Sequence, residues 1–130
     1  MLRRMSASDN EEGRTYRNLI DRLVHDCREG QGQVGPTRAR AALWNQNATP
    51  NDLPDQHAVN VLLARLSKED REVIARILEG AFVGGVHAAL VALHEAEIPP
   101  FDSGYEGTPF HDFMGRLSGD WEWPKSGRRT

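Results

Sequence analysis

The histidines of this chain, together with one aspartate, are the residues whose types could support metal chemistry. His87 and His94 are seven residues apart, so on a helix they lie along nearly the same line. A His-Asp pair, at positions 111 and 112, follows further along the chain. Imidazole nitrogens and a carboxylate are the ligands that zinc and similar ions accept in hydrolases. One hypothesis is therefore a metal-dependent hydrolase, with ligands drawn from His57, His87, His94, His111 and Asp112.

The spacing of the histidines argues against that hypothesis. Seven helical residues span about 10 Å, which is too far for two imidazoles to share one ion easily. The sequence HEAE, which begins at His94, also differs from the HExxH pattern of zinc proteases. Histidines that lie in or beside a core and are satisfied by hydrogen bonds explain the same residues without a metal. We therefore favour a protein without catalysis and without a cofactor.

A second set of candidates combines aromatic and acidic residues near the C-terminus. Most aromatic residues of the chain lie between Phe101 and Trp123, and acids are interspersed among them. Loops carry binding residues more often than the scaffold does, and tryptophan and tyrosine are frequent contact residues. We predict a small binding or regulatory protein whose protein or small-molecule partner contacts this segment. The predicted contact residues are Tyr105, Glu106, Trp121 and Trp123, with Asp102 and Asp120 at the rim.

The same aromatic rings have a purely structural explanation. Large rings bring much buried area to a small core, and this core is otherwise short of large side chains. The segment would then wrap the longest helix. The two interpretations are compatible if Tyr105 and one of the tryptophans stay partly exposed.

The element that must position both sets of residues is a long helix, predicted over residues 67–98. Ser67 suits its N-cap, and Pro99 and Pro100 end it because neither can donate to the helical ladder. Past Phe82 the apolar residues spread around the whole helix, which predicts that this half is enclosed by neighbours on several sides.

Two adjacent glycines, Gly84 and Gly85, interrupt that apolar half. Each glycine costs a helix roughly 1 kcal/mol relative to alanine, so the pair needs a reason. A kink, or the close approach of another helix, would supply one. A homodimer formed through this half of the helix is a further hypothesis.

Four shorter helices are predicted around the long one. Apolar spacing indicates a helix from Tyr16 to Cys27, and prolines at first-turn positions indicate three more, which start near Pro36, Pro54 and Pro109. The predicted fold is all-α, a small irregular helical bundle around one long central helix, with the aromatic-rich C-terminal segment packed on it. The predicted organisation is a disordered lead-in over 1–13, one helical domain over 14–124 and a flexible tail over 125–130.

The composition of the chain limits the cellular location and the classes of partner that we expect. The chain has 130 residues and a formal net charge of −3, which does not favour nucleic acid as a partner. The single cysteine, Cys27, agrees with a reducing compartment, and the N-terminus lacks the apolar core of a signal peptide. We found no apolar run that approaches the length of a membrane span. We therefore expect a cytoplasmic protein with no membrane partner.

Overall fold

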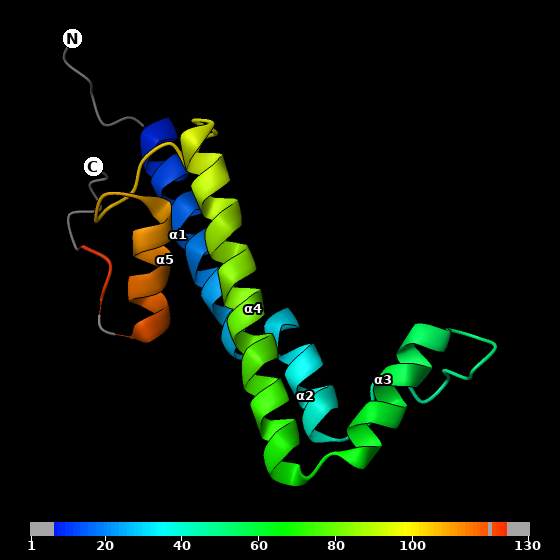
Figure 1. Ribbon diagram of the computed structural model, residues 1–130. Coiled ribbons are helices and arrows are strands. Elements are labelled where there is room, and N and C mark those ends of the chain that lie inside the picture. The colour runs from blue at the N-terminus through cyan, green and yellow to red at the C-terminus, as the bar shows by residue number, and fades with distance from the viewer. Residues whose placement is uncertain (1–6, 120, 125–130) are drawn as a thin grey trace. The chain divides into compact units, whose positions relative to one another are not determined.

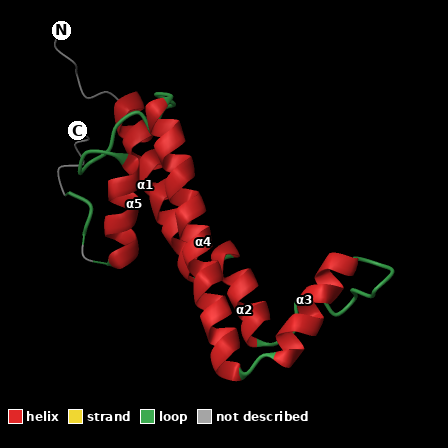
Figure 2. Ribbon diagram, viewed as in Figure 1, coloured by secondary structure: helices red, strands yellow, loops and turns green. Residues whose placement is uncertain are grey.

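The computed structural model describes residues 7–119 and 121–124, and within those ranges all regular structure is helical (Figures 1 and 2). The predicted all-α class is confirmed, with one long central helix and an aromatic cluster near the C-terminus. The elements are α1 (Ala7–Arg28), the 3-10 helix η1 (Gln31–Gln33), α2 (Val34–Arg40), α3 (Pro54–Arg65), α4 (Lys68–Glu95) and α5 (Pro109–Ser118).

The chain divides into two compact units. Unit 1 combines the chain up to His25 with the chain from Gly85 onward, and unit 2 runs from Asp26 to Gly84. The boundaries fall inside α1 and α4, so each of these helices contributes residues to both units.

Local capping explains where two of the helices begin. Ser67 Oγ accepts a hydrogen bond from the Asp70 backbone N–H at 3.1 Å, which satisfies one of the free donors in the first turn of α4. Thr108 Oγ1 accepts from the His111 N–H at the start of α5, and Pro109 occupies the first helical position. Both starts therefore follow from residues within one turn, as the sequence predicted.

Unit 2 is held together by a small core and a network of polar side chains. Ala39, Leu63 and Ala75 are buried together, one from each of α2, α3 and α4. Asn60 of α3 accepts from the backbone N–H of Trp44 and donates to the carbonyl of Asn45, which fixes the loop after α2. Partly buried apolar side chains surround the three core residues: Ala42, Trp44, Val59, Leu66, Ile74 and Leu78.

Two boundaries differ from the predictions. The helix α1 begins at Ala7, so residues 7–13 are helical and not part of a disordered lead-in. The helix α2, which was predicted to run from about Pro36 to Asn45, ends at Arg40, and Ala42 has a left-handed backbone with φ of 61° before the chain reaches Trp44. The predicted tail over 125–130 lies outside the described residues.

The long helix α4 is present, but the prediction that its second half is enclosed is wrong. In that half, from Phe82 to the end of α4, Leu90 is the one buried side chain. Gly84, Gly85, Ala88 and Ala92 are exposed instead. The spread of apolar residues around the helix indicated burial, but the described residues of this chain do not supply the cover.

The same helix corrects the expectation about membrane-length segments. By length and composition α4 could cross a membrane: an 18-residue window has a mean hydropathy of 1.5 and is 6% buried. Core helices of water-soluble proteins can pass the same test, but those helices are mostly buried. The low burial of α4 is therefore the feature that needs an explanation.

Candidate functional site

The centre of the candidate site is a buried carboxylate, Asp112, in the first turn of α5. Asp112 is fully buried. Its Oδ2 accepts from the Tyr16 hydroxyl and from the Tyr105 backbone N–H at 2.7 Å, and its Oδ1 accepts from the Glu106 N–H at 2.8 Å. A buried carboxylate is tolerated when its lone pairs are hydrogen-bonded in this way. Asp112 therefore joins α1, α5 and the loop before α5.

The close fit of that loop depends on a glycine. A Cβ added to Gly104 would lie 2.6 Å from the Thr108 carbonyl carbon and 2.9 Å from Asp112 Oδ2. Such contacts are too short for any side chain, so the loop can approach the carboxylate only because position 104 has none.

Aromatic rings surround the buried carboxylate. The Tyr16 ring stacks on Tyr105 at a centroid distance of 5.8 Å and meets the edges of Phe101 and Trp123 at 6.1 and 6.0 Å. Trp123 also lies 4.8 Å from Trp121 in a T-shaped arrangement. Edge-to-face and offset ring pairs of this kind stabilise a core beyond the area they bury. These rings join the start of the chain to its last described residues.

A second carboxylate, Asp21 of α1, holds the end of the chain. Its Oδ1 accepts from Arg116 Nε at 2.9 Å and its Oδ2 accepts from Trp123 Nε1 at 3.0 Å. The Arg116 guanidinium also lies over the Trp123 ring, 5.5 Å from its centroid. One arginine is therefore held between an indole face and a carboxylate.

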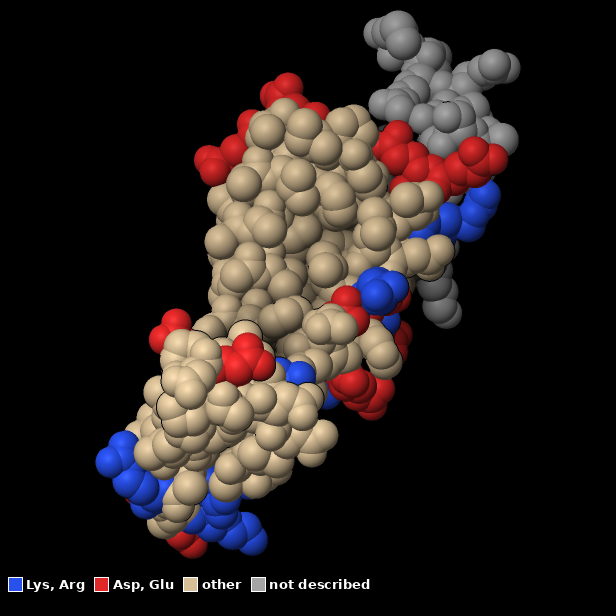
Figure 3. All heavy atoms as spheres, turned by 90° about the vertical axis from the view of Figure 1, so that its right-hand side faces the viewer, with Lys and Arg blue, Asp and Glu red and all other residues tan. Residues whose placement is uncertain are grey.

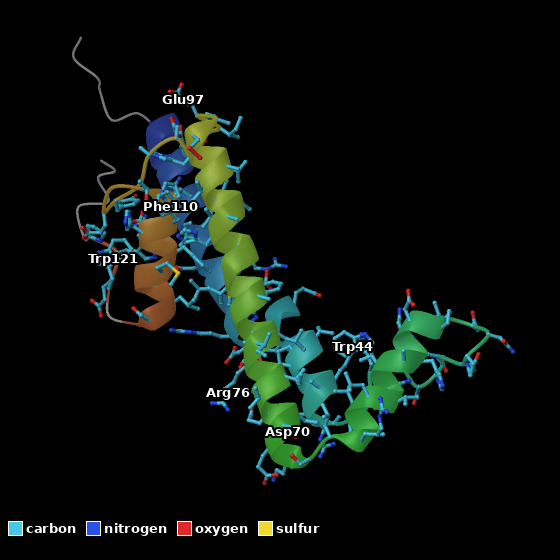
Figure 4. All side chains as sticks on the ribbon, viewed as in Figure 1. Trp44, Asp70, Arg76, Glu97, Phe110 and Trp121 are labelled. Atoms are coloured by element: carbon cyan, nitrogen blue, oxygen red, sulfur yellow. The ribbon has the colours of Figure 1, made fainter. Side chains whose placement is uncertain are left out.

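The outer part of the cluster is formed by Trp121 and Glu106. The Trp121 indole N–H donates to Glu106 Oε1 at 2.6 Å, and the Glu106 side chain is exposed. Trp121 is partly buried because its Cβ and ring lie against Gly115 of α5. In Figure 4 Trp121 lies at the outer side of this region, beside α5. The pair therefore presents an oriented indole beside an exposed carboxylate.

The structure changes the role of one predicted contact residue. Tyr105 is 4% exposed and stacks inside the cluster, so it is a core residue and cannot offer its ring to a partner. Asp102 and Glu106 are exposed, and Trp121 and Trp123 are partly buried. Asp120 lies outside the described residues. The remaining contact surface stays a prediction, now centred on Glu106 and Trp121.

Three of the histidines gather around one phenylalanine of α5. The Phe110 ring lies 5.1 Å from His87, 6.3 Å from His94 and 4.9 Å from His111, measured between ring centroids. His94 Nδ1 lies 3.0 Å from the Phe101 carbonyl oxygen, and His111 Nδ1 lies 2.7 Å from Thr108 Oγ1. All three imidazoles therefore pack against an apolar ring, and those of His94 and His111 also have a hydrogen-bond partner nearby in the chain.

This arrangement does not support the predicted metal site. Among the described residues, no group of three or more His, Cys, Asp or Glu side chains could hold an ion. Asp112 directs both of its oxygens to hydrogen bonds inside the cluster. The set His57, His87, His94, His111 and Asp112 is therefore not a ligand set in this structure. The Phe110 ring packs against His87, His94 and His111, and Asp112 is already hydrogen-bonded.

Unit 2 carries a separate charged pocket of about 390 Å³. Arg40 donates twice to Glu72 Oε2, from Nε at 3.0 Å and from Nη2 at 2.8 Å, and this hydrogen bonding lowers the pKa of the Glu72 carboxyl. Arg40 and Glu72 pair with each other, and the other lining residues carry both signs of charge, so the pocket has no clear preference for an anion or a cation. The lining residues are Arg40, Lys68, Glu69, Glu72 and Arg76.

The single cysteine has no exposed, reactive environment. Cys27 is buried, and burial together with the nearby Asp26 charge raises the pKa of its thiol. A thiol in this state is a small apolar side chain and a poor nucleophile.

Sequence reasoning missed three residues that build the cluster. Tyr16 served only to predict the first helix, and neither Asp21 nor Arg116 was proposed as a site residue. Tyr16 lies 96 positions from Asp112, and Asp21 lies 95 positions from Arg116. Pairs of residues so far apart in the sequence cannot be recognised from local spacing. The one available signal was the position of Asp112 in a first helical turn, where a carboxylate is favoured.

Comparison with known proteins gives one match. No curated protein and no solved structure matches the chain. A family model described as a family of unknown function, DUF6547, matches residues 9–125. The match includes α3, α4, α5 and the aromatic cluster up to Pro124, and it covers most of the 130 residues. The chain therefore belongs to the DUF6547 family of unknown function.

Proposed function

We propose that this protein is a cytoplasmic, non-enzymatic binding protein that takes a basic segment of a partner protein on Glu106 and Trp121. The observation that carries the proposal is the 2.6 Å hydrogen bond from the Trp121 indole to Glu106. This bond and the contact with Gly115 hold a large ring in one orientation at the surface. An aromatic side chain that is ordered before binding loses little entropy when a partner arrives.

The charge around Trp121 supports a basic partner. Glu122 follows Trp121 in the chain and is exposed, and the exposed Glu106 accepts the indole hydrogen bond. Asp102, the predicted rim residue, is exposed on the loop before α5. An indole face attracts cations, and nearby carboxylates strengthen that attraction. The protein already holds one arginine in this manner, since Arg116 lies between Trp123 and Asp21. An arginine of a partner would use Trp121 and Glu106 in the same way.

A peptide titration tests the proposal. A fluorescein-labelled arginine-rich peptide is titrated with protein, and binding is followed by fluorescence anisotropy. Trp121→Ala should weaken binding roughly 10-fold or more, and Glu106→Gln should weaken it roughly 3-fold or more, since the contact loses a cation–π surface or a charge. Asp55→Asn removes one negative charge at an exposed position of unit 2, whereas Glu106 and Trp121 belong to unit 1, so it is the matched control and should bind like the wild type.

Two outcomes would contradict this function. One is equal binding of the peptide by the wild type and by Trp121→Ala, which would mean that the peptide only senses net charge. The other is a Trp121→Ala protein whose melting temperature falls as far as that of Tyr105→Ala. A loss of that size would make Trp121 a core residue like Tyr105, which the proposal does not allow.

A further inference from the structure

The helix α4 carries an apolar face that no described part of the chain covers. Val73 and Ile77 are 46% and 61% exposed, and Gly80, Gly84, Ala88 and Ala92 continue the line at intervals of three or four residues. Residues at this spacing lie on one side of a helix. These six residues are called the α4 face. In Figure 3 a broad area of α4 shows no Lys, Arg, Asp or Glu.

The glycines of α4 have no packing reason among the residues that the structure describes. A Cβ added to Gly80, Gly84 or Gly85 would meet no atom within 4 Å. Each glycine nevertheless costs the helix roughly 1 kcal/mol relative to alanine. Small residues four positions apart let a second helix approach closely, backbone against backbone. The α4 face therefore suits a helix as its occupant.

A second copy of α4 matches this face in shape when the two helices run antiparallel. If they cross between Gly84 and Gly85, Ile77 of one copy lies level with Ala92 of the other, because each is about 7.5 residues from the crossing point. Large side chains meet small ones at both ends, and glycines meet at the centre. A parallel pair would instead set Ile77 against Ile77 and leave Ala92 facing Ala92 across a gap.

The charges at the two ends of the face also favour the antiparallel pair. Arg76 is exposed beside the N-terminal half of the face, and Glu95 is exposed at its C-terminal end (Arg76 is labelled in Figure 4). Antiparallel pairing brings Glu95 of one copy within about 3 Å, measured along the axis, of the level of Arg76 in the other. Parallel pairing brings Glu95 against Glu95 and Asp70 against Asp70, which is repulsive.

We propose that this protein forms a homodimer in which the α4 face packs antiparallel on the α4 face of a second copy, with the crossing at Gly84 and Gly85. The contact is isologous, so the same face serves both copies and the assembly closes as a pair. It also removes from water a helix window that is 6% buried in the single chain. This inference is independent of the Trp121 site.

Sedimentation velocity over a range of protein concentrations tests the dimer. The wild type should sediment as a dimer at concentrations of about 10 µM and above. Gly84→Leu places a bulky side chain at the crossing in both copies and should weaken dimerisation at least about 10-fold. Ala89→Leu adds the same kind of bulk at an exposed position away from the α4 face, and should sediment like the wild type. Circular dichroism checks that both variants keep their helix content.

Disulfide cross-linking tests the orientation without changing Gly84. A protein with Ile77→Cys and Ala92→Cys together should form a covalent dimer under mild oxidation. Ile77→Cys alone should not, because the two copies of residue 77 would be about 22 Å apart along the axis. The native Cys27 is buried and does not compete.

Several results would overturn the homodimer. If the wild-type protein stays monomeric at about 100 µM, a second copy does not cover the α4 face. A dimer that Gly84→Leu does not weaken uses another surface. Efficient cross-linking by Ile77→Cys alone indicates parallel helices. Sedimentation of a monomer with phosphatidylcholine vesicles would assign the face to lipid instead.

Discussion

At the scale of single residues, the Asp112 carboxylate connects several segments of unit 1. It accepts from one side chain and two backbone N–H groups, and these donors come from α1 and from the loop before α5. Hydrogen bonds to a charged acceptor contribute more than neutral ones, and an unpaired buried donor is costly. The residue that the sequence offered as a metal ligand is therefore a structural anchor.

Asp112→Asn should lower the free energy of unfolding by about 3 kcal/mol. The asparagine side chain has one acceptor oxygen, so at least one of the Tyr16, Tyr105 and Glu106 donors loses its partner or meets an amide N–H. Urea denaturation followed by circular dichroism measures the change. Asp55→Asn, at an exposed position in the first turn of α3, is the control and should change stability by less than about 0.5 kcal/mol. An Asp112→Asn protein as stable as this control would show that the carboxylate does not anchor the loop.

At the scale of elements, residues within one turn decide where a helix begins, but they do not decide which neighbours pack against it. Ser67 and Thr108 cap α4 and α5 as their sequence context indicates. Leu53 precedes α3 in a left-handed conformation with φ of 61° and without a capping side chain. Thr49 Oγ1 accepts a hydrogen bond from the Asp52 N–H, so a short turn of the loop comes directly before α3.

Ser67→Ala should lower the free energy of unfolding by about 1 kcal/mol, because the Asp70 N–H loses its acceptor and the first turn of α4 frays. Ser67→Asp keeps an acceptor at the same position and should lie within a few tenths of a kcal/mol of the wild type. Chemical denaturation at one fixed protein concentration measures both variants. If alanine and aspartate destabilise equally, the cap does not contribute to the stability of α4.

At the scale of the whole molecule, unit 1 is assembled from residues at the two ends of the chain. Tyr16 and Asp21 of α1 contact Trp123, the last aromatic residue of the described chain, through ring packing and an indole hydrogen bond. Contacts of this sequence separation form only after most of the chain has been brought together, so they are slow to form and cooperative.

A chain that ends at Gly119 should unfold at a lower temperature than the full chain. It lacks Trp121 and Trp123, so the Tyr16 and Tyr105 rings lose packing and Asp21 loses the indole donor. The expected loss is about 2 to 4 kcal/mol, measured by calorimetry. The full chain with Trp121→Ala and Trp123→Ala should reproduce most of it. A shortened chain that melts like the wild type would show that these indoles do not stabilise unit 1.

The sequence by itself determined the class of fold and the approximate limits of its helices. Apolar spacing, a capping serine or threonine and a first-turn proline all act within four or five residues, so they can be recognised without coordinates. The start of α5 at Thr108 and Pro109 and the start of α4 after Ser67 were predictable for this reason.

The tertiary structure alone decided which side chains meet and which stay exposed. The pairing of Tyr16 with Asp112 and the burial of Tyr105 depend on how distant segments pack, and local spacing does not encode this. The exposure of α4 shows the same limit. Its apolar residues indicate that something covers them, but periodicity cannot distinguish a neighbour in the same chain from a neighbour in another molecule.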